Sequence, residues 1–305
     1  PLTYLAADEQ NQNLSKDLIN WLTVILGVGL IMYVVNPEFA TLVGRYRGLL
    51  GNPNGMGILL TVTAPLYLLL KRRDSELFEN KWKEYLFLGV FILSLILTGS
   101  RTSLFAILMF IVFVRLRFLS NSVTLVVFLV LVIGYEFLLS SLPLIAQWLG
   151  IEGYLRLDTL EEGSGRFIAW NFAWEQIQDV FFIGGGFGYT ETVFNDHFTD
   201  LSMLGHQGNS HNSYLTLWLD TGLIGLLLLI VSLIRTAVRG VKTSVYVLPV
   251  LYCVLFSANF ESWYAASLNP FTSLFLISLT MLLMEAQGSE KTTEGDTEKE
   301  IVQTN

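Results

Sequence analysis

The chain has 305 residues, of which 52% are hydrophobic and 14% are charged, and its formal net charge is −8. A soluble domain carries roughly 25% charged residues, so this composition, with a mean hydropathy of +0.54, excludes an ordinary soluble protein. The acidic balance also excludes a basic surface for nucleic acid. Cys253 is the single cysteine, which excludes an internal disulfide.

Eight apolar segments, nearly free of charge, follow one another and are predicted to be transmembrane helices. The third is short for a bilayer, and its helix is expected to extend back to Trp82. The expected spans are residues 18–35, 56–70, 85–98, 103–119, 122–146, 213–234, 244–258 and 268–284. We therefore expect an all-α polytopic membrane protein. It begins at Pro1 with no signal peptide before the first span, so we expect an N-terminally truncated piece of a longer protein.

Lysine and arginine are concentrated in alternate short loops, which predicts the orientation of the spans. One set of loops holds Lys71, Arg72, Arg73, Lys81, Lys83, Arg115, Arg117, Arg235, Arg239 and Lys242. The opposite set holds only Arg45, Arg47, Arg101, Arg156 and Arg166, spread over a greater length. We expect the richer side and both termini to face the cytoplasm.

This orientation divides the chain into four parts. Residues 18–146 hold five spans, residues 147–211 form one large external loop, and residues 212–284 hold three further spans. Residues 285–305 form an acidic tail that we expect to be disordered and cytoplasmic.

Two short external connections are polar, Gly51–Gly55 and Thr98–Thr102. Glycine and asparagine permit tight turns at the membrane surface, so a simple hairpin turn is sufficient for the first. The second also places Arg101 at the bilayer boundary. Pro65 and Pro249 lie within spans, and each is expected to kink its helix.

Apolar residues recur in the large loop at helical spacing, at Phe167, Trp170, Trp174, Ile177 and Phe181. This pattern predicts an amphipathic helix whose apolar face rests on the membrane or on the spans, with Ser164 as N-cap and Gly184–Gly186 as its end. Arg166 then lies in the first turn, where backbone N–H groups favour a bound anion. The alternative is a solvated arginine that pairs with Glu161 or Glu162.

His211 directly precedes the sixth span, which Asp220, Gly222 and Gly225 interrupt. The glycines permit close approach of a neighbouring helix. Asp220 lies roughly 12 Å along the helix, and an ionisable residue at that depth is a functional or a pairing candidate. By composition alone, a histidine at a helix start more often has a structural role than a catalytic one.

The spacing around His211 resembles a family signature. His211-Asn212, followed after nine residues by Gly222-Leu223-Ile224-Gly225, is similar to the pattern of the O-antigen ligase and polymerase superfamily. Its members are bacterial membrane glycosyltransferases that act on undecaprenyl-diphosphate-linked glycans.

Three further motifs carry the same resemblance, which covers about residues 40–285. Gly165-Arg166 with its aromatic helix and Gly184–Gly188 resembles the family's large periplasmic loop. Thr98–Thr102 resembles its upstream arginine motif, and Gly51–Asn54 recurs in relatives.

The resemblance implies a metal-independent transfer that needs no cofactor. Arg166 and Arg101 would hold the donor diphosphate, since a guanidinium binds phosphate in a bidentate manner and keeps its charge. His211 would act as the base on the acceptor hydroxyl. The implied partners are an undecaprenyl-diphosphate-linked glycan donor, a glycan or lipid-core acceptor and the lipid bilayer. The implied location is the bacterial cytoplasmic (inner) membrane, with the large loop on the periplasmic face.

Further polar residues are predicted to contact the substrate, namely Asn212, Asn52, Asn54, His206, Asp220 and Glu261. His206 is only five residues from His211, and Glu261 lies in the last external loop, where it would help to read the acceptor. His197 is expected at the surface. The acceptor stays open between a lipid A–core sugar, a growing polysaccharide and a protein hydroxyl.

Other classes of function compete with the transferase. A solute transporter is the main alternative, because polar interruptions in spans fit a substrate path, although Asp220 is nearly alone as a charge within a span. A metal-dependent glycosyltransferase would use Asp158, Glu161 and Glu162, for which a solvated acidic patch is the simpler explanation. A non-catalytic scaffold would leave the combination of Arg166 and His211 unexplained.

Overall fold

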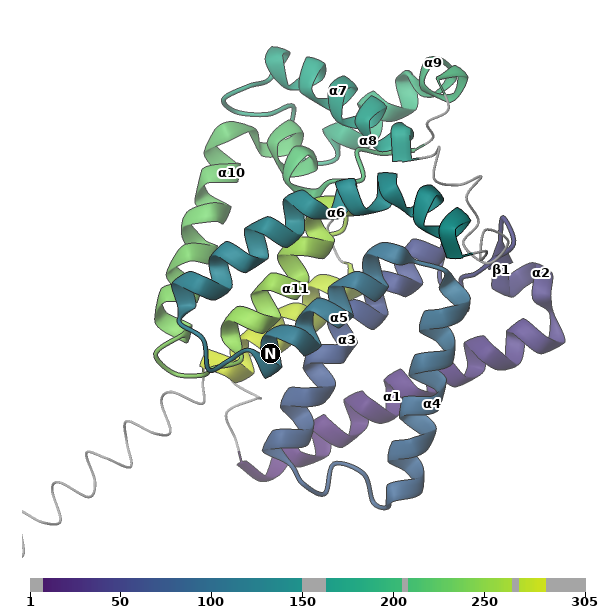
Figure 1. Cartoon of the computed structure of the whole chain (residues 1–305), viewed down its shortest axis with the longest axis vertical. Coiled ribbons are helices and arrows are strands. Elements are labelled where there is room, and N and C mark those ends of the chain that lie inside the picture. Colours follow the sequence, from purple (N-terminus) through teal and green to yellow (C-terminus); the bar gives the residue numbers. More distant parts are fainter. Residues whose placement is uncertain (1–7, 150–162, 205–207, 265–268, 284–305) are drawn as a thin grey trace, which may run out of the picture. The chain divides into compact units, whose positions relative to one another are not determined.

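The computed structural model describes residues 8–149, 163–204, 208–264 and 269–283, and nearly all of them are helical (Figure 1). The helices are α1 (Asp8–Val35), α2 (Pro37–Ala40), α3 (Pro53–Arg73), α4 (Lys81–Thr98), α5 (Arg101–Arg115), α6 (Asn121–Leu149), α7 (Gly163–Asp179), α8 (Tyr189–Asp196), α9 (Phe198–Met203), α10 (Ser213–Gly240), α11 (Val247–Phe260) and a last helix over Pro270–Leu283. A small antiparallel hairpin joins β1 (Thr41–Leu42) to β2 (Arg45–Tyr46).

Each of the eight expected spans coincides with one of these helices, and α4 begins at Lys81, so the extension to Trp82 is confirmed. Among the described residues, three helices are long and apolar enough to cross a membrane, over Leu14–Val35, Pro53–Arg73 and Ser213–Gly240. Shorter apolar helices cover Asn121–Tyr135, Val247–Phe260 and Pro270–Leu283. The helical class is therefore confirmed, and the number of eight spans stays a prediction. The acidic tail lies outside the described residues.

The chain divides into two compact units. The first unit comprises Pro1–Arg115, Thr236–Ser257 and Leu268–Asn305, and the second comprises Leu116–Arg235 and Ala258–Ser267.

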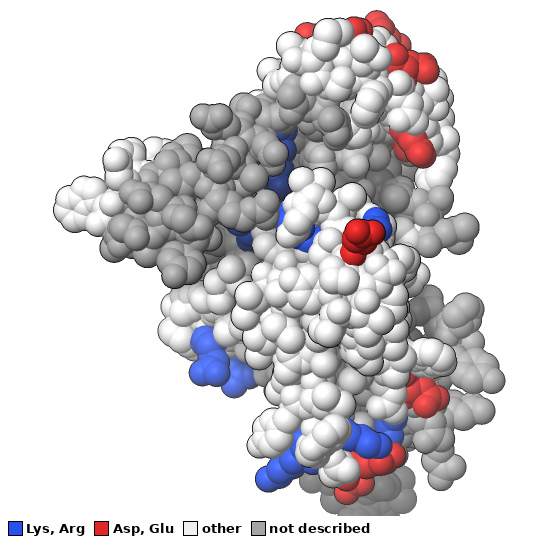
Figure 2. Space-filling view, turned by 90° about the vertical axis from the view of Figure 1, so that its right-hand side faces the viewer, with Lys and Arg blue, Asp and Glu red and all other residues white. Residues whose placement is uncertain are grey.

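In the first unit, α3 is the central helix, and α4 and α5 pack against it. Its apolar side chains are buried over most of its length, including Met56, Leu60 and Leu66 at 0% exposure. Lys and Arg side chains gather at the end of this unit where α3 ends and α4 begins, and the helices above are largely uncharged in Figure 2. This distribution is the one that a membrane-embedded helix bundle requires.

The two prolines expected to kink their helices lie in different contexts. Pro65 is inside α3, as predicted. Pro249 is the third residue of α11, where the backbone N–H has no partner within the helix in any case. The kink expected at Pro249 is therefore wrong, because proline in a first turn removes no helical hydrogen bond.

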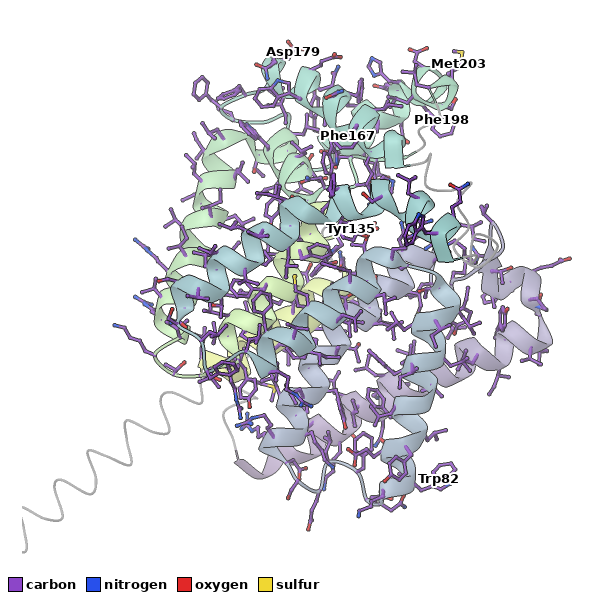
Figure 3. All side chains as sticks on the ribbon, in the orientation of Figure 1. Trp82, Tyr135, Phe167, Asp179, Phe198 and Met203 are labelled. Carbon is purple, nitrogen blue, oxygen red and sulfur yellow. The ribbon has the colours of Figure 1, made fainter. Side chains whose placement is uncertain are left out.

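In the second unit, the large loop contains α7, α8 and α9, of which only α7 was predicted. The buried face of α7 consists of Ala169, Ala173 and Ile177, which pack against Phe194, Leu201 and Leu219. The expected apolar face is only partly covered, since Phe167, which is labelled in Figure 3, is 50% exposed and Trp174 is 48% exposed. The two alanines take the inner positions because small side chains let the neighbouring helices approach closely.

The helix α10 is broken at Gly222, whose backbone has a φ of 69° and a ψ of −176°. The segment of residues 180–188, which joins α7 to α8 and is called the elbow below, lies in this break. The N–H groups of Gly185 and Gly186 donate to the carbonyls of Leu219 and Asp220, at 2.8 and 3.0 Å. In return, the N–H groups of Leu223 and Ile224 donate to Phe181 and Phe182, at 2.8 and 3.3 Å. The backbone groups that the break releases are thus paired again, as a membrane environment demands.

Asp220 fixes the far end of the elbow. Its Oδ1 accepts hydrogen bonds from the backbone N–H and the hydroxyl of Thr190, at 2.8 and 2.7 Å. Its Oδ2 accepts from the N–H of Gly188 at 3.2 Å. An ionised carboxylate forms stronger hydrogen bonds than a neutral acceptor, so Asp220 anchors the start of α8 to α10.

We expect Gly222→Ala to destabilise the second unit, because a Cβ at residue 222 would overlap the backbone of Phe182. The positive φ at this position adds backbone strain of about 1–3 kcal/mol. The midpoint of thermal unfolding of the purified protein in detergent measures the effect. Gly134→Ala in α6 is the control, since a Cβ there meets nothing within 4 Å. Equal midpoints for the two variants would contradict the role of the break.

Candidate functional site

His211 lies in the turn directly before α10, as predicted, and its backbone has a φ of 45°. This left-handed conformation is uncommon for a residue other than glycine. Hydrogen bonds hold the turn on both sides of His211. Its own N–H donates to Oδ1 of Asn209 at 2.8 Å, and the N–H of Asn212 donates to Oγ of Ser262 at 2.9 Å. The direction of the imidazole is therefore set by the backbone of the turn.

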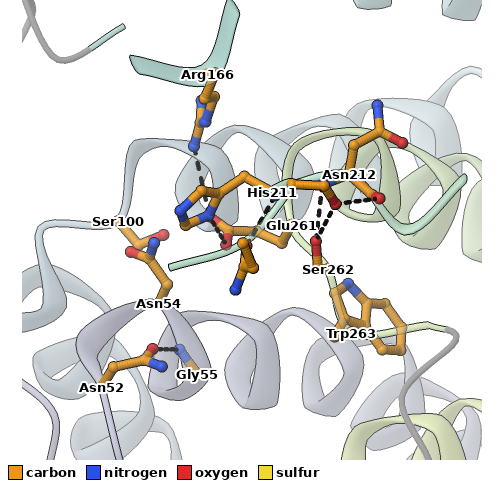
Figure 4. A network of polar contacts seen from close by, with 12 residues as sticks. Asn52, Asn54, Gly55, Ser100, Arg166, His211, Asn212, Glu261, Ser262 and Trp263 are labelled. Carbon is orange, nitrogen blue, oxygen red and sulfur yellow. Dashed lines mark hydrogen bonds and ion pairs between the residues drawn. The ribbon is translucent and has the colours of Figure 1, made fainter. Parts of the chain in front are cut away.

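The side chains of Arg166 and His211 meet at the same carboxylate (Figure 4). Oε1 of Glu261 is 3.5 Å from Nη2 of Arg166, and Oε2 is 3.6 Å from Nδ1 of His211. The Glu261 side chain is only 6% exposed, whereas those of Arg166 and His211 are 20% and 26% exposed. A buried carboxylate requires compensating partners, and here the two residues predicted to be catalytic supply them.

The turn that carries Glu261 is fastened to the start of α10 by Ser213. The Ser213 hydroxyl donates to the carbonyl of Glu261 at 2.6 Å and accepts the N–H groups of Trp263 and Tyr264, both at 3.0 Å. Burial raises the pKa of Tyr264 to about 12, so this phenol stays protonated at neutral pH. Sequence reasoning missed Ser213 and Ser262, although both stand beside a predicted site residue.

Arg166 is the fourth residue of α7, so the prediction that it lies in the first turn is confirmed. Its guanidinium lies 5.7 Å from the centroid of the Phe260 ring. Glu161 and Glu162, the alternative partners expected from the sequence, lie outside the described residues. Arg166 thus places a permanent positive charge at the start of a helix. The backbone N–H groups at a helix start also favour a bound anion.

Asn212, predicted to contact substrate, caps α10. Its Oδ1 accepts hydrogen bonds from the N–H groups of Tyr214 and Leu215, at 2.9 and 3.1 Å. Asp220, predicted in the same way, anchors the start of α8 with both carboxylate oxygens. The structure thus gives each residue a structural role within the second unit, and their contact with substrate stays a prediction.

In the first unit, the two polar turns lie side by side and Arg45 joins them. Its Nε donates to the carbonyl of Thr98 at 2.9 Å, and its Nη2 donates to Oδ1 of Asn54 at 3.0 Å. Arg101 lies within the second turn, Thr98–Thr102, and is the first residue of α5. Sequence reasoning counted Arg45 only as a loop charge and missed this connection, because β2 brings it to the turns through the fold.

Asn52 has a local role, since its Oδ1 caps α3 by accepting the N–H of Gly55 at 2.6 Å. His197 is half-buried; its Nδ1 lies 3.0 Å from the carbonyl of Val193 and its ring lies beside Phe172. His206 and the acidic residues Asp158, Glu161 and Glu162 lie outside the described residues. The expectation that the acidic cluster is a solvated patch, and its alternative, a metal site, both concern residues outside the described ranges.

Residues 86–230 match the family model described as O-antigen ligase. The match includes Arg101, Arg166 and His211, and it ends before Glu261. No curated protein matches the chain. This match confirms the resemblance of residues 86–230 to the O-antigen ligase and polymerase superfamily. Members of this family are bacterial membrane glycosyltransferases of the ligase or polymerase type that act on lipid-linked glycans.

We expect Asn212→Ala to lower the free energy of unfolding by about 1 kcal/mol, the usual cost of losing an N-cap side chain. Asn212→Asp retains the acceptor oxygen and should keep the stability of the wild type. Thermal unfolding in detergent compares the two variants. A stability of Asn212→Ala equal to that of the wild type would show that the cap contributes nothing.

Proposed function

We propose that the protein transfers a glycan from an undecaprenyl-diphosphate donor to an acceptor hydroxyl at the external face of the membrane. The observation that carries this proposal is the shared carboxylate of Glu261, which brings the predicted phosphate ligand Arg166 and the predicted base His211 to one place. In the reaction, the acceptor oxygen forms a bond to the anomeric carbon. The bond from this carbon to the diphosphate oxygen breaks, and the diphosphate departs with the electron pair.

In this proposal Arg166 stabilises the departing diphosphate. Negative charge grows on the leaving oxygens in the transition state, and a fixed guanidinium that meets it lowers the barrier. The backbone N–H groups at the start of α7 lie beside the same charge. These groups make a metal ion unnecessary for the departure of the leaving group.

His211 takes the proton of the acceptor hydroxyl. Its Nδ1 faces Glu261, so Nε2 is the atom that would accept this proton. Glu261 is the positioning residue, because its carboxylate orients the imidazole and favours the positively charged imidazolium that proton transfer creates.

The contact between Arg166 and Glu261 also supplies a link between donor binding and the base. Charge-assisted hydrogen bonds between nitrogen and oxygen are about 2.7–2.9 Å long, so the 3.5 Å contact of Arg166 is a loose one. A diphosphate offers a more highly charged partner for the guanidinium. When the guanidinium of Arg166 turns to the donor, the carboxylate of Glu261 keeps its contact with His211.

Arg101 is proposed as a second diphosphate ligand on the basis of the family resemblance and of its position at the start of α5. Asn52 and Asn54 belong to the adjacent turn of the first unit. In this proposal they support the turns that carry Arg101.

We expect Arg166→Ala and His211→Ala to insert normally but to leave lipid-linked glycan unused. Loss of the base should lower the rate of transfer by about 10²–10⁴-fold. The assay uses membrane vesicles, undecaprenyl-diphosphate-linked glycan and acceptor, with EDTA present throughout. Glu191→Gln, an exposed carboxylate of α8, is the matched control.

The outcomes separate the classes of function. Full transfer by His211→Ala at equal membrane abundance would exclude His211 as the base. Loss of wild-type transfer in EDTA would favour a metal-dependent transferase. Solute uptake by reconstituted wild-type protein, unchanged in Arg166→Ala, would favour a transporter.

Glu261→Gln tests the positioning role separately. We expect kcat to fall by up to about 10⁴-fold, the effect of replacing by its amide the carboxylate that orients the catalytic histidine of a serine protease. The KM for the donor should not rise, because Arg166 keeps its charge and loses a competing carboxylate. Kinetics in the same vesicles measure both constants. An unchanged kcat, or a rise of KM alone, would remove Glu261 from this role.

A further inference from the structure

The lipid-facing stripe of α10 is too short for a bilayer. Within this helix, exposed large apolar side chains begin at Ile224 and end at Val238, whereas none of residues 213–223 is exposed. At the helical rise of 1.5 Å per residue, this stripe is about 21 Å long. The hydrocarbon core of a bilayer is about 30 Å thick, so about 9 Å at the Ser213 end needs apolar surface from elsewhere.

The elbow continues the stripe at that end. It is hydrogen-bonded to α10 at Leu223 and Ile224, where the exposed stripe begins. Its side chains Phe182, Ile183 and Phe187 are 65%, 79% and 69% exposed. The sequence of residues 180–188 contains no charged or hydrogen-bonding side chain.

Much of the backbone of the elbow is hydrogen-bonded within the protein. The N–H of Gly184 donates to the carbonyl of Val180 at 2.8 Å, in addition to the bonds with α10 given above. The carbonyl of Phe181 also accepts the indole N–H of Trp218 at 3.0 Å. These bonds pair the backbone of the elbow on the side that faces α10, and irregular backbone at membrane depth is tolerated where protein covers it in this way.

The residues that flank the elbow indicate the position of the membrane–water interface. The Trp218 ring packs edge-on against Phe181 and Trp174, with centroids 5.2 and 5.5 Å apart, and tryptophan is enriched at the membrane–water interface. Exposed acidic side chains lie on the neighbouring helices, at Glu175, Asp179, Glu191, Asp196 and Asp200. In Figure 2 acidic side chains gather at the end of the second unit that carries α7–α9.

We propose that the elbow is inserted into the leaflet at the Ser213 end of α10, with Phe182, Ile183 and Phe187 against lipid acyl chains. The exposed acids of α7–α9 then stay in water above the headgroups. This insertion docks the external helices on the membrane. The proposal rests on the apolar surface and the backbone hydrogen bonds, so it is independent of the transfer reaction.

Site-directed spin labels test this insertion in lipid nanodiscs. Phe182→Cys, Ile183→Cys and Phe187→Cys each carry a nitroxide, and the wild type is the blank because Cys253 is fully buried. Power saturation compares the accessibility of the label to oxygen, which partitions into lipid, and to a water-soluble nickel chelate. We expect oxygen to exceed nickel at all three positions, as at the control Leu228→Cys in α10, and the reverse at Glu191→Cys.

Nickel in excess of oxygen at the elbow would place it in water and overturn the proposal. Low access of both reagents would show that protein, such as a second copy of the chain, covers it, which also overturns the proposal. The wild type supplies a second measurement that needs no variant. In nanodiscs with diazirine-labelled acyl chains, we expect adducts on the peptide that contains residues 180–188, and their absence would contradict insertion.

Discussion

A carboxylate is costly to bury unless positive charge or hydrogen-bond donors surround it, and this constraint organises the second unit around Glu261. The first turn of α7, the turn before α10 and the turn after α11 meet at this one side chain through Arg166, His211 and the backbone contacts of Ser213. The carboxylate is buried while its two partners retain exposure. The arrangement therefore holds a cation and an imidazole close together at an accessible surface.

The broken helix α10 serves the same site from the other side. Because Gly222 departs from helical geometry, the elbow enters the break and fixes the end of α7 to α10. Asp220 then fixes the start of α8. The position of Arg166 on α7 thus depends on a glycine and an aspartate far from it in sequence, which act by packing and by hydrogen bonding. The two motifs of the family signature consequently have different surroundings. His211 contacts Glu261 in the site, whereas Gly222 forms the break in α10 that supports the site.

Much of the site was open to prediction where its causes are local. The first turn of α7 followed from the apolar spacing after Arg166, and the start of α10 followed from the polar run that ends at His211. The buried face of α7 was not predicted in full. Ala169 and Ala173 are buried because their small side chains let the neighbouring helices approach, whereas hydrophobicity alone favoured the aromatic side chains. The short helices α8 and α9 were missed because tertiary contacts stabilise helices too short to form alone.

The sequence by itself determined the helical class and the resemblance to the family, and it predicted the roles of Arg166 and His211, since hydropathy, helical period and motif spacing are properties of neighbouring residues. Only the tertiary structure decided that Glu261, which is 95 residues from Arg166 in sequence, receives both side chains. It also gave Arg45 its place between the two polar turns of the first unit. The physical reason is common to both cases. A charged side chain in a helical membrane protein pairs with whichever segment the packing brings within reach. The distance between two such segments in space cannot be read from their separation in sequence.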